Sequence, residues 1–205
     1  MSRRNPARNQ ERILRAATEE FARYGLGGAR VDRIAARAGA NKRMLYYYYG
    51  NKEDLFLAVL EARYAHIRRA ELGLHLLDLD PVQGMRRLVE FTWDYYLKHP
   101  EFLTLLNSEN LHRARHLKRS RGIAAMHSPL IAILRDLLAR GVRDGKFRKG
   151  VDPVQLYISI AALGYFYLSN RHTLSTIFER DLLSPKSKAE RLKHMTELVL
   201  GYLAK

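Results

Sequence analysis

The sequence has 205 residues, of which 47% are hydrophobic, contains no cysteine, and has a formal net charge of +15. This length and apolar content are sufficient for a buried core, and the lack of cysteine excludes disulfides, thiolate zinc sites and cysteine nucleophiles. No window approaches the ~20 apolar residues of a membrane-spanning helix, so we expect a cytoplasmic protein with no membrane partner.

The positive charge is concentrated at the N-terminal end. Residues 1–52 contain 12 Lys or Arg and 4 Asp or Glu, a net of +8, whereas the other 153 residues have a net of +7. The net charge favours an anionic partner, either nucleic acid or an anionic membrane surface. We expect residues 1–10 to form a mobile basic arm. A helix should follow, because Ile13, Ala17 and Phe21 repeat at helical spacing as far as Gly25.

Two short helical patterns lie between Gly25 and Lys52. The first contains Val31, Ile34, Ala35 and Ala38, and the second contains Met44, Leu45, Tyr48 and Tyr49. Between them, Gly39 can adopt the left-handed conformation that ends a helix, and Asn41 can cap the next helix. Two helices joined by so short a turn predict a helix-turn-helix over residues 31–52. The first residues of its second helix, Lys42 and Arg43, would then reach base edges in the major groove.

The four consecutive tyrosines, Tyr46 to Tyr49, cannot share one role, because successive helical residues point about 100° apart. Leu45 and Tyr49 are expected to face the core. Tyr46 and Tyr48 are expected to face outward, where a phenol can donate to a phosphate oxygen. Lys52 adds a charge at the next helix start, which also suits a phosphate. The alternative is that these aromatic rings only pack and the basic residues form a solvated face.

The rest of the chain is predicted to be helical, with starts marked by proline. Asn51 can cap a helix that runs through Ala62, and a turn is expected between Gly145 and Gly150. Five prolines follow a polar residue and precede apolar residues three or four apart: Asp80-Pro81, His99-Pro100, Ser128-Pro129, Asp152-Pro153 and Ser184-Pro185. Proline suits the first position of a helix because its missing N–H would be unpaired there. The sequence therefore predicts an all-α fold of about nine helices.

An ordered set of residues at the N-terminal end resembles the signature of the TetR family over residues 10 to 56. It comprises Arg12-Ile13-Leu14-Arg15-Ala16-Ala17, Phe21, Gly25, Ile34-Ala35, Ala38-Gly39, Leu45-Tyr46 and Lys52-Glu53-Asp54-Leu55. The resemblance implies a DNA-binding domain at 1–52 and an effector-binding and dimerisation domain at 53–205. It further implies a homodimeric repressor that binds a palindromic operator in double-stranded DNA and is released by a small-molecule effector, without a cofactor.

Carried over by position, the resemblance places the start of the recognition helix at Lys42, Arg43 and Met44. It places phosphate contacts at Tyr46, Tyr48 and Lys52. One departure lies at Ala29-Arg30, where family members commonly have Thr or Ser as a helix cap and phosphate ligand. Arg30 is a candidate phosphate contact, but its side chain cannot accept a capping hydrogen bond. A second departure is Tyr48-Tyr49, where the family usually has His-Phe.

The C-terminal part is rich in aromatic residues, which at helical spacing form a core more often than a pocket. Because the resemblance implies an effector cavity, ten residues are candidate ligand contacts: Phe91, Trp93, Tyr96, Phe102, Asn107, Glu109, Asn110, Tyr165, Phe166 and Asn170. Glu109, His112 and His116 would share one face of a continuous helix, as metal ligands do. The basic residues that follow favour a surface segment over a metal site. Alternatively, the same basic cluster could receive a carboxylate or phosphate group of an effector. We therefore predict no metal.

Dimerisation is expected through the last two long helices. Ala161, Ala162 and Gly164 would allow close approach of one helix, and the other offers an apolar face of Leu192, Met195, Leu198, Val199 and Tyr202. Packing of these residues within one chain is the alternative. Two other functions remain open: an architectural or non-specific DNA-binding protein, for which the charge would suffice, and an all-α enzyme. No nucleophile elbow, P-loop, HExxH motif or dinucleotide fingerprint supports an enzyme.

Overall fold

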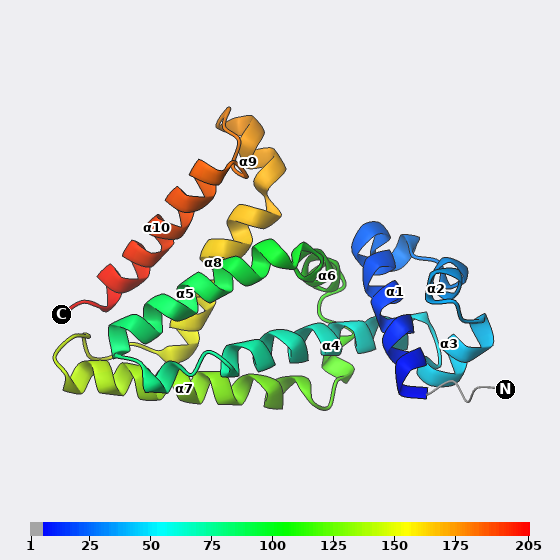
Figure 1. Ribbon diagram of the computed structural model, residues 1–205, viewed down its shortest axis with the longest axis horizontal. Helices are drawn as coiled ribbons and strands as arrows, with labels where there is room; N and C mark the ends of the chain where they lie inside the picture. Colours follow the sequence, from blue (N-terminus) through cyan, green and yellow to red (C-terminus); the bar gives the residue numbers. More distant parts are fainter. Residues whose placement is uncertain (1–5) are drawn as a thin grey trace. The chain divides into compact units, whose positions relative to one another are not determined.

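The computed structural model describes residues 6–205 and confirms the all-α fold, with ten α-helices in that range where the sequence predicts about nine. The helices are α1 (Pro6–Gly28), α2 (Val31–Ala38), α3 (Lys42–Tyr49), α4 (Lys52–Leu72), α5 (Pro81–Lys98), α6 (Pro100–Leu111), α7 (Ile123–Arg143), α8 (Pro153–Ser169), α9 (Arg171–Ile177) and α10 (Pro185–Leu203) (Figure 1). Short 3-10 helices, η1 (Leu76–Asp78) and η2 (Leu117–Arg119), lie in two of the connections. None of these helices is long and apolar enough to cross a bilayer.

The chain forms two compact units. Unit 1 consists of Met1–His66 with Pro100–Ala124, and unit 2 consists of Ile67–His99 with Ala125–Lys205. These units describe packing. The functional division into residues 1–52 and 53–205 stays a prediction. Its boundary falls at the first residue of α4, whereas the boundary between the compact units falls within α4, after His66.

Four of the five proline-marked helix starts are confirmed, at Pro81, Pro100, Pro153 and Pro185. Asp80, Asp152 and Ser184 each accept a hydrogen bond from a backbone N–H of the first turn that follows. The fifth is wrong, because Pro129 lies inside α7. That helix begins six residues earlier, where the Ser120 hydroxyl accepts from the N–H of Gly122 and Ile123.

The first helix begins earlier than the sequence indicates. Residues 6–10, expected in a mobile arm, form the first turns of α1, and residues 1–5 lie outside the described residues. Gly25 interrupts the helical conformation with φ 64° and ψ 179°, so the break expected there is confirmed. Glycine tolerates this positive φ without steric cost.

Unit 1 is organised around one apolar core. α1, α2 and α3 contribute Ile13, Phe21, Ile34 and Leu45, and α4 contributes Phe56. Phe21 and Phe56 meet edge to face with ring centroids 5.1 Å apart. The core thus joins the predicted helix-turn-helix to the helices on either side of it.

Unit 2 is built from α5, α8 and α10, which pack against one another, together with α7 (Figure 1). Trp93 of α5 is buried and meets Tyr167 of α8 edge to face, with ring centroids 5.6 Å apart. Gly164 allows α8 to approach α5 closely, because a Cβ there would lie 3.1 Å from the ring of Tyr96. Ala161, Ala162 and Gly164 were predicted to allow close approach of α8 to a second copy. Gly164 instead allows close packing within the chain.

A charged pair is buried in unit 2. Arg68 and Glu71, one helical turn apart on α4, are joined by an ion pair of 2.9 Å, and the Arg68 guanidinium also donates to the Tyr157 hydroxyl at 2.8 Å. Burial raises the pKa of Glu71 to about 7, and the charge of Arg68 only partly opposes this shift. The folded state therefore holds a proton on Glu71 at a pH where an exposed carboxyl has lost it.

This shift predicts a pH dependence of stability. Because the pKa of Glu71 is raised on folding, the free energy of unfolding should fall as pH rises from about 4.5 to 7, by about 3 kcal/mol at most. Glu71→Gln removes this titration. We therefore expect the melting temperature of the variant, relative to that of the wild type, to be higher at pH 8 than at pH 5. Glu197→Gln, at an exposed carboxylate of α10, should show no such difference.

Candidate DNA-binding motif

The turn between α2 and α3 has the predicted conformation. Gly39 adopts the left-handed region with φ 56°, and its N–H donates to the carbonyl of Ala36 at 3.1 Å. Asn41 then caps α3, because its Oδ1 accepts from the N–H of Met44 at 2.9 Å. Leu45 is buried against the core of unit 1. These contacts confirm the two short helices and the tight joint that a helix-turn-helix requires.

The start of α2 is built differently from a helix with a Ser or Thr cap. Arg30 occupies the cap position in an extended conformation, and its side chain makes no capping hydrogen bond. Its guanidinium instead binds Asp32 through two hydrogen bonds, of 3.2 and 2.8 Å. Arg30 lowers the pKa of the Asp32 carboxyl to about 2, so this pair stays charged throughout the neutral range. The positive charge of Arg30 is thus already paired in the protein without DNA.

This pairing predicts that Asp32 modulates DNA affinity. Asp32→Asn removes a negative charge next to the motif and releases Arg30, so we expect binding to duplex DNA of random sequence to tighten several-fold at low salt. Fluorescence anisotropy titrations at two salt concentrations would measure this. Asp144→Asn removes one charge at an exposed site of unit 2 and serves as the control. An equal gain in both variants would show that only net charge matters.

The predicted base-reading residues lie at the beginning of α3. Lys42 and Arg43 are exposed, and Met44 is half-buried. The hydrogen bonds and ion pairs of the described residues assign no carboxylate partner to Lys42 or Arg43, unlike Arg30. Two long cationic side chains at the first positions of an eight-residue helix are therefore available to an anionic partner.

The tyrosines of α3 divide into two pairs. Tyr46 and Tyr47 are 50% and 84% exposed, so the outward position predicted for Tyr46 is confirmed. Tyr48, also predicted to face outward, is half-buried against the core of unit 1 together with Tyr49, because it packs against the helices around it. The Tyr49 hydroxyl donates to the carbonyl of Gln10 at 3.2 Å, and burial with the neighbouring Tyr48 raises its pKa to about 12. Tyr47, the most exposed of the four, is absent from the sequence-predicted contacts. Its exposure could have been predicted from the sequence, because Tyr47 lies about 200° around the helix from Leu45, which is buried.

Lys52 contacts the segment that precedes α2. Its Nζ donates to the carbonyl of Ala29 at 3.2 Å and that of Gly27 at 3.5 Å. The ammonium therefore holds the end of α1 near the start of α4. Two of its three donors are used in this way, which leaves one for a phosphate oxygen.

The ten candidate effector contacts fall into both compact units. Phe91, Trp93, Tyr96, Tyr165, Phe166 and Asn170 belong to unit 2, and Phe102, Asn107, Glu109 and Asn110 belong to unit 1. Trp93, Tyr96 and Phe102 are buried, whereas Phe166 is 59% exposed. The side-chain amides of Asn110 and Asn170 each donate to the carbonyl four residues earlier in the chain.

Glu109 has a role within unit 1. Helix α6 ends at Leu111, and Arg113 and Ala114 adopt positive φ, so the continuous helix that would align Glu109, His112 and His116 does not form. The chain instead turns back over Glu109. The buried Glu109 carboxylate accepts from the backbone N–H of His116 and Leu117, both at 2.8 Å, and lies 2.6 Å from His116 Nδ1.

The basic segment after α6 is also engaged within unit 1. Arg115 forms two hydrogen bonds with Glu53, and Arg119 pairs with Asp54, both at the start of α4. Ser120 donates to Glu61 at 2.5 Å. These pairs tie the segment to α4, so its charge is only partly available to an anionic ligand.

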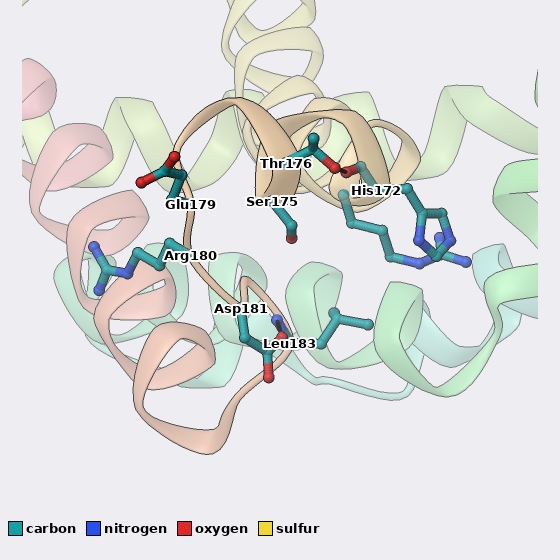
Figure 2. Close-up of a pocket in the computed structure, with 8 residues that line it drawn as sticks. His172, Ser175, Thr176, Glu179, Arg180, Asp181 and Leu183 are labelled. Carbon is teal, nitrogen blue, oxygen red and sulfur yellow. Dashed lines mark hydrogen bonds between the residues drawn. The ribbon is translucent and has the colours of Figure 1, made fainter.

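A surface hollow of about 440 Å³ lies in unit 2 at α9 and the chain that follows it (Figure 2). Its lining includes His172, Ser175, Glu179, Arg180 and Asp181, and none of the ten candidate effector contacts. Arg180 pairs with Glu190 of α10. The sequence carries no signal for this hollow, because its residues come from a short helix and an irregular loop.

Unit 2 exposes an apolar stripe. Val154, Ile158, Ala162 and Phe166 recur every four residues along α8 and are all exposed. On α10, Leu198 and Tyr202 are likewise exposed. Met195 and Val199 were expected in the same dimer-forming face, but they are buried within their own chain. Leu198 and Tyr202 lie at the exposed edge of the same apolar stripe. Each helix thus packs part of its apolar surface within the chain and leaves the rest uncovered.

Comparison with known proteins identifies the family. Residues 13–59 match the family model described as bacterial regulatory proteins, tetR family, and residues 81–199 match the tetracyclin repressor-like C-terminal domain. The HTH-type transcriptional repressor NicS of Pseudomonas putida is 42% identical over 94% of this chain and 91% of its own length. The HTH-type transcriptional repressor SCO4008 of Streptomyces coelicolor is 38% identical over 69% of this chain and 71% of its own length.

A solved structure agrees with this assignment. The Streptomyces coelicolor protein SCO4942 superposes with a TM-score of 0.71 at 26% identity, over 95% of this chain and 98% of that one. The two matched regions contain the helix-turn-helix and most of unit 2. They confirm a DNA-binding regulator and exclude the enzyme alternative. The chain belongs to the TetR family of bacterial regulatory proteins.

Proposed function

We propose that this protein is a cytoplasmic transcriptional repressor that binds a palindromic operator in double-stranded DNA as a homodimer and is released by a small-molecule effector. Membership of the TetR family and the 42% identity to a transcriptional repressor support repression. The observation that carries the DNA-binding part is the exposed start of α3, where Lys42 and Arg43 have no carboxylate in hydrogen-bond or ion-pair contact among residues 6–205. This helix is capped and held against a buried core.

The proposed DNA face has two kinds of contact. Lys42 and Arg43 read base edges, with Met44 beside them for an apolar contact such as a thymine methyl group. Phosphate oxygens are bound by the hydroxyls of Tyr46 and Tyr48 and by the free donor of Lys52. Arg30 joins them when a phosphate replaces Asp32 as its partner. To these we add Tyr47, because its exposure exceeds that of every other tyrosine in α3.

The homodimer is proposed to form through α8 and α10. The exposed stripes of these two helices supply apolar surface that a second copy can cover, and a twofold interface uses the same surface on both subunits. Two recognition helices about one DNA turn apart then bind two half-sites together.

The effector is proposed to bind within unit 2 among Trp93, Tyr96 and Tyr165, whereas the exposed Phe166 belongs to the stripe of α8 assigned to the dimer. The aromatic rings would cover an apolar body. Arg68, which contacts Tyr157 of α8 in the same unit, offers a donor to such a ligand, because its buried Nε has no hydrogen-bond partner in the part of the chain that the structure describes. A ligand's polar group gains most where it satisfies such an atom. Phe91 and Asn170 belong to the same unit, whereas Phe102, Asn107, Glu109 and Asn110 would need a second contact region.

Selection from a random pool of duplex DNA tests the proposal. After several rounds of binding to the wild-type protein at physiological salt, we expect enrichment of a twofold-symmetric sequence whose half-sites are centred about 10 base pairs apart. The enriched duplex should bind at least about 1,000-fold more tightly than random duplex. A protein that enriches no sequence and binds all duplexes equally would be a non-specific DNA binder.

A further inference from the structure

One face of α1 spans α2 from end to end. Arg12, Ala16 and Glu20 follow one another at intervals of four residues and therefore share a face of α1. At a rise of about 1.5 Å per residue, Arg12 and Glu20 lie ~12 Å apart along the axis, which is also the length of the eight-residue α2. The two charged side chains thus reach opposite ends of α2.

Glu20 contacts the start of α2. Its Oε1 accepts from the backbone N–H of Arg30 at 3.0 Å and from Arg33 Nε at 2.6 Å. In a capping box, the N–H of the cap residue is bound by a Glu or Gln at the third position of the same helix. That position is Arg33 here, and an arginine has no acceptor. Glu20 therefore supplies from α1 the acceptor that α2 lacks.

Burial of the Glu20 carboxylate is energetically unfavourable, and the hydrogen bonds to α2 give a reason for a carboxylate at this buried position. Its side chain is 1% exposed, and Oε2 has no hydrogen-bond partner among the described residues. An unpaired carboxylate oxygen in a core is unfavourable, and an apolar side chain at the same position would avoid the penalty.

Arg12 acts at the other end of α2. Its guanidinium donates to the carbonyls of Ala38 and Gly39, the latter at 3.3 Å. A Cβ at position 39 would displace this guanidinium, and the positive φ of Gly39 by itself favours glycine there. The signs also match the helix dipole, with a carboxylate near the N-terminus of α2 and a cation near its C-terminus.

We infer that Glu20 is a positioning residue for the helix-turn-helix: from α1 it completes the cap of α2 and so holds α2 and the attached recognition helix in the orientation that binds DNA. It replaces the cap that the family commonly provides at the position of Arg30. The inference rests on the proposed DNA binding.

The test moves the hydrogen-bond acceptor for the Arg30 N–H from Glu20 of α1 to a residue of α2 itself. Glu20→Leu removes it and suits the buried position. Glu20→Leu with Arg33→Gln restores it, because a glutamine at the third position can reach the N–H of Arg30. Glu20→Leu with Arg33→Met is the matched control, since it also removes the arginine but provides no acceptor. Glu19→Gln, at the adjacent half-exposed carboxylate, controls for the loss of charge on α1.

Two quantities are measured for each variant: the affinity for the duplex selected by the wild-type protein, and the hydrogen exchange of the Arg30 amide by NMR. We expect Glu20→Leu and the methionine variant to bind about five-fold more weakly, as for a lost cap, with faster exchange. The glutamine variant should return to within about two-fold of the wild type, with slow exchange.

Two results would overturn the inference: wild-type affinity and slow exchange in Glu20→Leu, or equal rescue by methionine and glutamine. Equal rescue would show that Glu20 acts only as an ion-pair partner of Arg33 and not as a cap of α2. The exchange measurement needs no DNA. It therefore tests the cap even if the wild-type protein selects no duplex, which is the outcome that would overturn the proposed function instead.

Discussion

Replacing Lys42 and Arg43 together with alanine is expected to weaken operator binding by at least about 100-fold. Each bidentate contact from a cationic side chain to a base contributes about 1–3 kcal/mol of discrimination, and both residues lie exposed at the start of the recognition helix. The loss should be larger for the selected operator than for random duplex, because base contacts carry the specificity. Anisotropy titrations with both duplexes at several salt concentrations would measure the two affinities and their salt dependence.

The matched control removes the same charge elsewhere. Arg86 and Arg87 are exposed on α5 in unit 2, so Arg86→Ala with Arg87→Ala lowers the net charge by the same amount. We expect this control to change operator and random-duplex binding to a similar, small extent. If the Lys42 and Arg43 variant behaved like the control, these two residues would not read the operator.

Ile158→Glu is expected to separate the dimer and to abolish tight operator binding. Ile158 is 51% exposed at the centre of the apolar stripe of α8. In a twofold interface each copy would bring one carboxylate into the apolar contact, and burying an unpaired charge is strongly unfavourable. Light scattering should give the mass of one 23.8 kDa chain where the wild type gives twice that mass.

The effect on DNA follows from the linkage of two half-sites. A dimer binds the second half-site at a high effective concentration, so operator affinity should fall by about 100-fold or more in a monomer. Leu111→Glu introduces the same charge at an 83% exposed apolar residue of α6 in unit 1, outside the stripes of α8 and α10, and should leave the mass unchanged. A dimeric Ile158→Glu protein with normal operator affinity would place the interface elsewhere.

Local sequence signals were sufficient to predict helix starts and ends where residues within one turn of the chain determine the conformation. Gly39 ends α2, Asn41 caps α3, and Pro153 after Asp152 begins α8 as predicted. In each case the determining contact joins residues within five positions of one another. Pro129 shows the limit of such signals, because a cap at Ser120 had already begun α7.

Contacts between distant residues were not predictable from spacing. The acceptor for Arg30 comes from Glu20, and the carbonyl partners of Lys52 come from the end of α1. The end of α6 at Leu111 likewise depends on Glu109, which binds the backbone seven and eight residues later in the chain. Periodicity identifies a polar residue on a helix but does not identify the backbone group that it meets.

The sequence by itself determined the all-α class, the helix-turn-helix at residues 31–52 and the family, because these depend on helical periodicity, local caps and an ordered set of residues. Only the tertiary structure decided which face of each helix is used. On α10 it buries Met195 and Val199 and exposes Leu198 and Tyr202, and on α3 it exposes Tyr47. Apolar side chains extend over a broad arc of these helices, so only packing against the rest of the chain determines which part of the arc is covered.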